Sequence, residues 1–271
     1  MFTITRNGLD AISKDLGVIS NNIANAGTNG FKRSRTEFVD IYSKSLSDSP
    51  GNKVGLGSLF QGSQKIMQQG SPIMTDGALD LNISGRGFFV LSPKVGADPR
   101  FTRDGSFSLD ASGNLITTDG FNVAGYKRDE LEGLITNVAE PINIPLSIVN
   151  NEGRTVSLTG INIDSYGNIE TTYGLNNIIK RGQIALAKFN NETELKSVGA
   201  NAYQASNKSG GQILGSALSG NFGQVISGAL ESSNTNIANE MVSMMKTQQA
   251  FNGNARIMQA SVDITRRLMD S

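Results

Sequence analysis

Apolar residues recur at alternating steps of three and four at both ends of the chain. Near the N-terminus the series is Phe2, Leu9, Ile12, Leu16, Ile19, Ile23 and Ala26. Near the C-terminus it is Ile237, Met241, Met244, Gln248, Phe251, Ala255, Met258, Val262, Thr265 and Met269. This spacing places the side chains in a narrow seam along one side of an α-helix. The sequence therefore predicts two terminal helices that pair with each other.

Residues that favour the start or the end of a helix support both predictions. The stretch Ser232–Asn236 offers several side chains that can accept hydrogen bonds at a helix N-terminus, and Glu240 follows in the first turns, where a negative charge suits the helix dipole. At the first helix, Asn25–Gly30 supplies the stop, since Asn29-Gly30 can adopt positive φ.

Between these ends the chain changes to short β-prone runs separated by glycine-containing turns. The runs are Phe88–Leu91, Phe101–Thr102, Phe107–Leu109, Leu115–Thr118, Phe121–Val123, Ile142–Ile144, Val156–Leu158, Ile161–Ile163 and Ile184–Phe189. Asp104-Gly105 and Asp119-Gly120 are residue pairs typical of two-residue hairpin turns. The predicted fold class is α+β, with paired terminal helices and a mainly antiparallel β-domain.

A short internal repeat lies within this β-region. Leu109–Thr118 is similar to Ile163–Thr172, and both contain the pattern Asp-x-x-Gly-Asn. Calcium-binding loops use a related pattern, but each copy here has too few acidic ligands, so a turn is the favoured interpretation. The sequence predicts two similar hairpins.

The domain boundaries follow from these patterns. We expect a discontinuous helical domain made of residues 1–35 and 234–271, and a β-rich domain at 76–233. Residues 36–75 are the least periodic stretch, with Ser43–Gly57 rich in Ser, Gly, Asn and Lys. We interpret 36–75 as an extended connector.

Composition excludes several classes of function. Lys plus Arg (24) equals Asp plus Glu (24), which gives no net field to attract nucleic acid. The chain has no Cys and no His, so thiol nucleophiles, His general bases and Cys or His metal sites are excluded. No apolar run is long enough to span a membrane, and no cleavable signal peptide is expected. We predict no enzyme activity, no cofactor and no metal.

Two groups of residues invite a catalytic interpretation. Gly85-Arg86-Gly87 resembles part of a phosphate-binding loop, but the remaining glycine or Lys-Ser/Thr is absent and a tight hairpin approach is favoured. The charged residues that might act as acid–base partners are Asp80, Asp104, Asp110, Arg86 and Arg103. A cell-wall glycosidase using two such carboxylates is one alternative class. An exported cap, scaffold or adhesin is another.

Three separated stretches carry a family resemblance. They are Gly8–Ala11 with Leu16–Lys32; Leu79–Phe89 with Phe101–Phe107; and Gly220–Gly223 with Gly228–Asn234, leading into Met244 and Gln248–Phe251. In this order they resemble the N-terminal signature, the β-domain entry and the C-terminal element of the bacterial flagellar axial proteins, the family of rod and hook subunits.

The resemblance implies that the terminal helices form an inner domain lining a narrow export channel, with the β-domain outside. It implies a helical homopolymer that transmits torque for motility and contacts adjacent rod and hook proteins. It also implies export by the flagellar type III apparatus, and a location in the basal body or hook. From spacing alone, an ordinary antiparallel helix pair packed inside one domain is favoured over a polymerisation surface, and the resemblance reverses that preference. With the resemblance, the expected subunit-assembly residues are Leu9, Ile12, Leu16, Ile19, Asn21, Asn22, Ile23, Asn25, Phe31, Ile237, Met241, Met244, Gln248, Phe251, Met258 and Val262.

Some features of the sequence resemble hook subunits, and others resemble rod subunits. Glu37–Tyr42, Val54–Gly57 and Gly182–Phe189 look most like hook subunits, and the longer insertion of a distal rod subunit before Gly55 is absent. A typical hook subunit, however, carries a large additional outer domain after Tyr126, where fewer than sixty residues here precede Gly182. The sequence favours a short hook-type or hook-like rod subunit, with a proximal or distal rod subunit as the alternative.

Overall fold

The protein divides into two compact units. The computed structural model describes residues 2–42, 55–92, 98–128, 135–149, 153–174 and 177–269. Unit 1 consists of residues 1–26, 33–66 and 235–271, and unit 2 consists of residues 27–32 and 67–234. The chain therefore begins and ends in unit 1.

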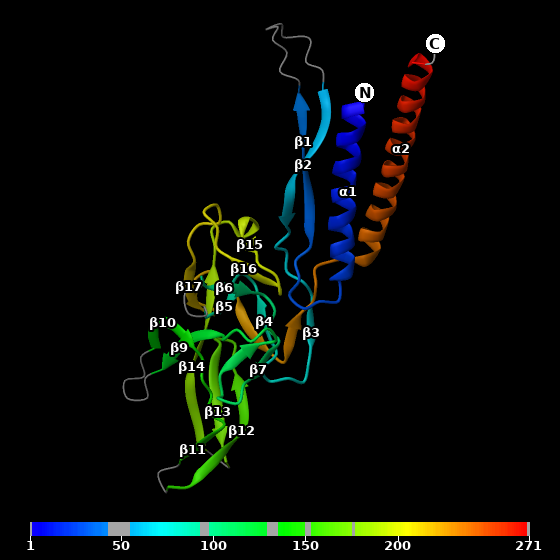
Figure 1. Ribbon diagram of the computed structural model, residues 1–271. Helices are drawn as coiled ribbons and strands as arrows, with labels where there is room; N and C mark the ends of the chain where they lie inside the picture. Colours follow the sequence, from blue (N-terminus) through cyan, green and yellow to red (C-terminus); the bar gives the residue numbers. More distant parts are fainter. Residues whose placement is uncertain are drawn as a thin grey trace. The chain divides into compact units, whose positions relative to one another are not determined.

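Unit 1 holds the two predicted helices, α1 (Phe2–Ala24) and α2 (Ile237–Met269). They pack side by side in opposite directions (Figure 1). Asn236 caps α2, because its side-chain Oδ1 accepts a hydrogen bond of 3.1 Å from the Asn239 amide. None of the helices in the described part of the chain combines the length and apolarity needed to cross a membrane.

A long antiparallel hairpin completes unit 1. It is formed by β1 (Ser34–Tyr42) and β2 (Gly55–Lys65), and both strands contact α1. Phe38 lies opposite Phe60 and Val39 opposite Leu59. These strands fall largely within 36–75, which the sequence analysis interprets as an extended connector. Part of the Ser-rich and Gly-rich stretch at 43–57, residues 43–54, lies outside the described residues.

Unit 2 is built almost entirely of antiparallel strands. The strands are β3 (Pro72–Met74), β4 (Leu81–Ser84), β5 (Phe88–Leu91), β6 (Arg100–Thr102), β7 (Phe107–Leu109), β8 (Leu115–Thr117), β9 (Ala124–Arg128), β10 (Ile135–Pro141), β11 (Ser147–Val149), β12 (Thr155–Ile163), β13 (Asn168–Tyr173), β14 (Asn177–Lys188), β15 (Lys196–Ser197), β16 (Ala202–Gln204), β17 (Ile213–Ser216), β18 (Gln224–Ser227) and β19 (Ala229–Glu231), with a short 3-10 helix at Glu192–Glu194. The main sheet runs in the order β11-β12-β13-β14-β5-β6-β16-β15, while β18 pairs with β4 and β19 with β3. The α+β class is confirmed.

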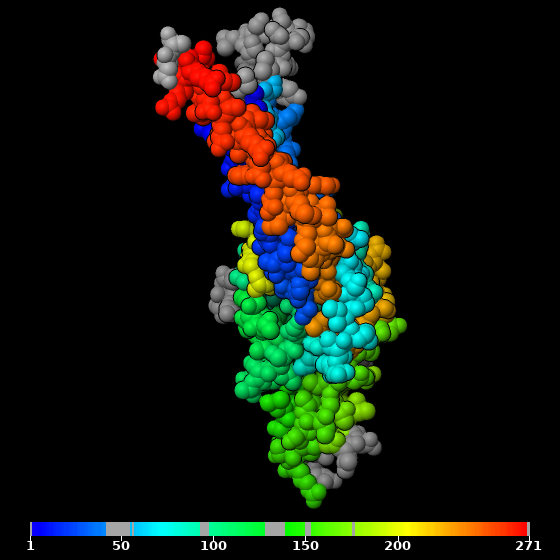
Figure 2. Space-filling model, turned by 90° about the vertical axis from the view of Figure 1, so that its right-hand side faces the viewer, coloured from blue at the N-terminus to red at the C-terminus, as the bar shows by residue number. Residues whose placement is uncertain are grey.

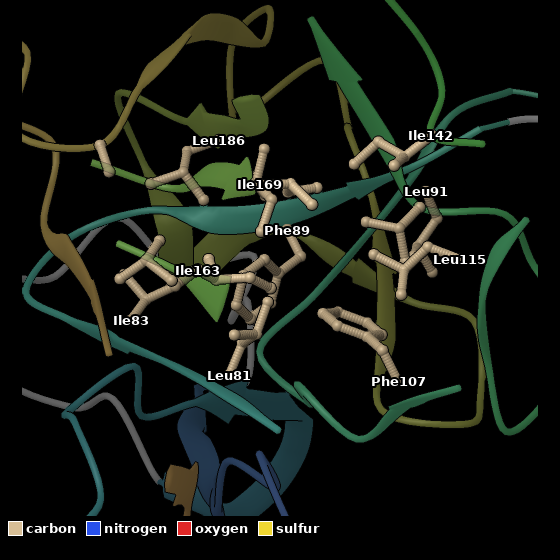
Figure 3. Packing of buried hydrophobic residues seen from close by; sticks show 14 of the residues in the cluster. Leu81, Ile83, Phe89, Leu91, Phe107, Leu115, Ile142, Ile163, Ile169 and Leu186 are labelled. Carbon is tan, nitrogen blue, oxygen red and sulfur yellow. The ribbon is translucent and has the colours of Figure 1, made fainter. Parts of the chain in front are cut away.

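Strands β5 and β14 lie at the centre of this sheet and are buried on both faces. Phe89, Leu91 and Leu186 point into one apolar cluster, shown in Figure 3. Phe88, Val90 and Ala187 point into the other. Alternate residues of a strand face opposite sides, so a strand buried on both faces must be apolar throughout. This explains the apolar runs at Phe88–Leu91 in β5 and at Ile184–Ala187 in the buried second half of β14.

The two repeated stretches form the predicted hairpins, β7–β8 and β12–β13. In the second, the Asp164 carboxylate accepts hydrogen bonds of 2.9 Å from the backbone amides of Tyr166 and Asn168 and from the Asn168 side-chain amide. Asp110 makes the matching bonds to Ser112 and Asn114. Both copies therefore form the same kind of turn, in which the aspartate side chain accepts hydrogen bonds from amides of the turn itself.

Two glycine-containing stretches that were predicted to form hairpins do not form them. Asp104-Gly105 joins β6 to β7, which pair with other strands, and a Cβ on Gly105 would lie 1.7 Å from the Leu81 carbonyl oxygen. This glycine permits a close backbone approach rather than a hairpin turn. Likewise, Gly85-Arg86-Gly87 joins β4 to β5 although these two strands do not pair with each other.

The other differences concern short runs. At Asp119-Gly120 only the glycine has positive φ, so the turn is not the two-residue type. Phe121–Val123 and Ile142–Ile144 contribute only isolated bridges, at Asn122, Val123 and Asn143. Ile142 and Ile144 are nevertheless buried in the core, because their backbone amides bond to Val123 and Gly113.

Candidate assembly surface and the meeting of the sequence motifs

The predicted seam residues of α1 lie against the rest of unit 1. Of the seam residues expected to take part in assembly, Ile19 is buried and Leu9, Ile12, Leu16 and Ile23 are half-buried, whereas Phe2 at the start of the seam is exposed. The helix that carries them contacts α2 and both strands of the hairpin. These side chains thus pack within one chain, and a contact with a second copy stays a prediction.

The predicted seam of α2 is divided between packed and exposed residues. Met244 and Met258 are half-buried. Five predicted residues remain exposed in the single chain: Ile237, Met241, Gln248, Phe251 and Val262. Figure 2 shows α2 as a continuous orange-to-red surface, with α1 in blue beside it. The exposed residues are available to a partner.

Further exposed apolar residues on α2 were missed by the sequence analysis. They are Val242, Met245, Ile257, Ile264 and Leu268, and Leu268 is 73% exposed. Ile257, Ile264 and Leu268 follow steps of seven and four, which place them on one stripe beside the predicted seam. Periodicity could have found this second stripe. Exposed apolar residues gathered on one side of a helix are typical of surfaces that contact a partner.

The three asparagines of the N-terminal motif that were predicted to take part in assembly have different environments. Asn21 is exposed, and Asn25 donates from Nδ2 to the Asn21 carbonyl oxygen at 2.9 Å. Asn22 is only 2% exposed. Its Nδ2 donates to the Ser34 carbonyl at 2.8 Å, its Oδ1 accepts from the Ser34 amide at 2.8 Å, and Nδ2 also reaches Glu240 Oε2 at 3.2 Å. Asn22 therefore joins α1 to the hairpin and to α2.

Phe31 begins a different arrangement, inside unit 2. It is buried, and its carbonyl oxygen accepts a hydrogen bond of 3.4 Å from the Asn234 amide. Next to it, Gly30 has φ +67°, and a Cβ there would lie 2.5 Å from the Asp104 nitrogen. The Gly30 amide donates to the Glu231 carbonyl at 2.7 Å. Glycine is thus required where the N-terminal motif enters unit 2.

A buried ion triad joins the three family motifs. Glu231, from the C-terminal motif, pairs through Oε1 with Lys32 of the N-terminal motif. Its Oε2 lies 3.3 Å from NH1 of Arg103, in the β-domain motif. The exposed fractions of these residues are 1% for Glu231, 1% for Lys32 and 4% for Arg103. Three stretches far apart in sequence therefore meet at one carboxylate.

Backbone groups complete the triad. The Gly70 amide donates to Glu231 Oε1 at 2.8 Å, and Lys32 Nζ donates to the Gln68 carbonyl at 2.8 Å. Arg103 donates from NH2 to the Gly85 carbonyl at 2.9 Å and lies 5.1 Å from the centre of the Phe88 ring. Charges removed from water require such partners.

Burial dominates the electrostatics of this cluster. It lowers the pKa of Lys32 and of Arg103, and the Glu231 carboxylate opposes both changes. Burial also raises the pKa of the Tyr203 hydroxyl, with Glu231 adding to the effect. Two cations share one buried carboxylate, so removal of its charge would leave both without their principal counter-ion.

The residues considered as acid–base partners are mostly engaged in structure. Asp110 holds its turn, and hydrogen bonds from Asn114 lower its pKa. Asp104 accepts hydrogen bonds from the Ser106 amide and hydroxyl. Arg103 belongs to the triad, while Arg86 is exposed. Among the residues that the structure describes, no three acidic side chains form a group able to hold a metal ion.

Family models match three parts of the chain. Residues 3–32 match the flagella basal body rod protein model. Residues 82–171 match the flagellar hook protein FlgE/F/G D1 domain, and residues 226–270 match the flagellar basal body rod FlgEFG protein C-terminal model. These ranges include Lys32, Arg103 and Glu231, the three members of the triad.

Individual relatives extend the similarity to nearly the whole chain. The flagellar basal-body rod protein FlgG of Buchnera aphidicola subsp. Schizaphis graminum is 33% identical over 98% of this chain and 96% of its own length. FlgG of Bacillus subtilis is 30% identical over 97% and 95%, respectively. The flagellar hook protein FlgE of Helicobacter mustelae is 44% identical, but over 46% of this chain and 30% of its own length. The chain belongs to the flagellar rod and hook protein family and is a structural subunit of the bacterial flagellar axis.

Proposed function

We propose that this chain is a subunit of the basal-body rod. The observation that carries the proposal is the extent of similarity: the rod proteins match along almost their whole length, whereas the hook protein matches over 30% of its own. This favours the rod alternative over the hook-type interpretation of the sequence motifs.

The content of unit 2 supports the same choice. Between Tyr126 and Gly182, the described residues contribute β10, β11, β12 and β13, and these strands join the main sheet of the unit. A large separate outer domain was the expected mark of a hook subunit in this segment. The strands found there instead extend the existing domain.

We further propose that copies assemble through the exposed apolar residues of α2, together with the helix α1 beside it. Burying apolar surface yields about 25 cal/mol per Å², and neighbouring copies would supply the covering surface. A helical tube requires heterologous contacts that do not close into a small ring. The expected product is a torque-transmitting homopolymer whose ends meet adjacent axial proteins.

The layered arrangement belongs to the same proposal. The discontinuous helical domain, at 1–35 and 234–271, would line the export channel, and the β-rich domain, at 76–233, would lie outside it. Most of the described residues of the predicted connector, 36–75, belong to the β1–β2 hairpin of unit 1, and the chain passes from unit 1 to unit 2 after residue 66. Delivery would use the type III export apparatus, and the protein would act by assembly rather than catalysis.

Assembly can be tested with charges on the exposed stripe. We expect Ile257→Asp and Leu268→Asp each to abolish formation of tubes by concentrated protein, because both residues are exposed and their replacement leaves the single chain folded. Gln259→Asp introduces the same charge at another exposed position of α2 and should leave assembly intact. Tube formation by both stripe variants would overturn the proposed surface.

Location separates rod from hook. Labelled protein in isolated basal bodies should lie in the straight segment inside the envelope. Label confined to the curved segment outside would instead support a hook subunit. Failure of the unsubstituted chain to polymerise, combined with cleavage of cell-wall fragments, would support the glycosidase alternative.

A further inference from the structure

Polar contacts between α1 and α2 recur at intervals of seven residues. Asn22 Nδ2 bonds to Glu240 Oε2 at 3.2 Å. Seven residues back along α1 and seven forward along α2, the Thr247 hydroxyl bonds to Asp15 Oδ2 at 3.0 Å. After another step of seven, a Cβ on Gly8 would lie 3.3 Å from Asn254 Nδ2. We call the first two contacts, Asn22–Glu240 and Asp15–Thr247, the polar rungs of the helix pair; the close approach of Asn254 to Gly8 marks the same alignment one heptad further on.

The two α1 residues of the polar rungs, Asn22 and Asp15, also form hydrogen bonds with strand β1 of the hairpin. Asn22 exchanges two hydrogen bonds with the backbone of Ser34, and Asp15 Oδ1 accepts a hydrogen bond from the Thr36 hydroxyl. Each of these α1 side chains therefore contacts both of its neighbouring elements. Asn22 and Glu240 are almost fully buried, so their polar atoms must find partners within the protein.

The apolar seam cannot set the alignment of the helices by itself. Its residues repeat at steps of three and four, so a slip of one heptad again places apolar side chains opposite one another. The polar rungs differ from one another and do not tolerate such a slip. A slip of one heptad in one direction would place Asp15 opposite Glu240, so that two carboxylates face each other. A slip in the other direction would move Asn22 away from Glu240, which would then lose its hydrogen bond from the Asn22 amide.

We propose that Asn22 and Asp15 are register-setting residues, which fix one alignment of α1, α2 and the β1–β2 hairpin. Buried polar residues at single seam positions specify register in coiled coils. The same chemistry operates here in an antiparallel helix pair. This role concerns a single chain and is independent of which axial structure it builds.

The alignment determines what the chain presents to a partner. Because Gly8 lies beside Asn254 and the helices run in opposite directions, Phe2 is level with about residue 260 of α2. About nine residues of α2 then extend past the start of α1, a length of about 13 Å at 1.5 Å per residue. This overhang carries Val262, Ile264 and Leu268, all exposed. A slipped pair would present a different apolar surface.

The absence of cysteine from the sequence makes the register directly measurable. Nitroxide labels on Ser13→Cys and Ser243→Cys, both exposed positions on opposite helices, report one distance by pulsed electron resonance. We expect a single narrow peak for the otherwise unsubstituted chain. A slip of one heptad displaces the helices by about 10 Å along their axes, and would appear as a second peak.

The informative variant replaces both α1 side chains by apolar ones. Asp15→Leu with Asn22→Leu should keep the helices paired but add the second peak, because no polar side chain of α1 then distinguishes the native alignment from a slipped one. Asp15→Asn, which can still bond to both threonine hydroxyls, should retain the single peak. Ile12→Leu with Ile19→Leu is the matched control, since it changes two apolar seam residues of the same helix and should leave the distance unchanged.

A second variant changes the polar residues on α2 and keeps the hydrogen bonds that Asn22 and Asp15 make with the hairpin. Glu240→Leu with Thr247→Val should give the same additional peak. The proposal is overturned if both double variants retain the single native distance, or if the unsubstituted chain itself shows several distances. Loss of helicity in both would also overturn it, because the rungs would then be needed for folding rather than for register.

Discussion

At the scale of single residues, Glu231 is the shared counter-ion of two buried cations in unit 2. It neutralises Lys32 and Arg103 and accepts the Gly70 amide from within the protein interior. Replacing such a buried ion cluster by apolar residues can be neutral, but removing one partner leaves the others uncompensated. The carboxylate is therefore needed as long as the two cations remain.

Glu231→Gln should lower the free energy of unfolding of unit 2 by about 3–5 kcal/mol. The amide keeps the shape of the side chain but provides no counter-charge for Lys32 and Arg103. Denaturant unfolding monitored by tyrosine fluorescence would measure the loss. Glu140→Gln makes the same change in the exposed pair with Lys127, where about 0–1 kcal/mol is expected. Equal losses in the two variants would contradict a special role for the triad.

At the scale of elements, the two aspartate-held turns are small structures with a defined chemical basis. Asp164→Ala removes three hydrogen bonds from the β12–β13 turn. We expect unit 2 to lose about 1–2 kcal/mol, because the turn is partly exposed and water replaces some of the bonds. Ser165→Ala changes an exposed neighbour in the same turn and should alter the unfolding midpoint little. A larger effect of the serine change would refute this account.

Elements determined by local chemistry were predictable from the sequence. The ends of α1 and α2 follow from caps and spacing. Strand β5 follows from a run that is apolar at every position, and the second half of β14 follows from the apolar run Ile184–Ala187. The β1–β2 hairpin was not predicted as such, because its strands mix charged and apolar residues and pack against α1 rather than within a sheet. Its alignment depends on Asn22 and Asp15, whose partners lie elsewhere in the chain.

The ion triad that joins the three motifs could not be predicted from the sequence either, because its members lie far apart along the chain. Lys32 and Glu231 are separated by 199 positions, and Arg103 and Glu231 by 128. No local pattern records an ion pair of that sequence separation. The sequence analysis placed Phe31 among the assembly residues, whereas its burial in unit 2 shows a contact within the chain. Asn22 likewise bonds to Ser34 and Glu240 of its own chain.

At the scale of the whole molecule, the two units differ in the size of their cores. Both apolar clusters consist of unit 2 residues. The buried residues of the unit 1 helices are Thr5, Ala11, Ile19 and Asn22 on α1 and Glu240 on α2. Opening unit 1 therefore exposes little additional apolar surface, and its stability depends more heavily on polar contacts and on any covering partner.

Hydrogen exchange should reveal this difference. In the isolated chain, we expect the amides of α1 and α2 to exchange faster than those of β5 and β14, because the helices open at a lower free energy. Assembly should slow exchange in the helices by at least about tenfold, which corresponds to about 1.4 kcal/mol, while β5 and β14 serve as the internal reference and remain unchanged. Mass spectrometry of the isolated and assembled protein would compare the same peptides. Helices already protected as strongly as β5 in the isolated chain, or unaffected by assembly, would show that unit 1 does not draw its stability from neighbouring copies.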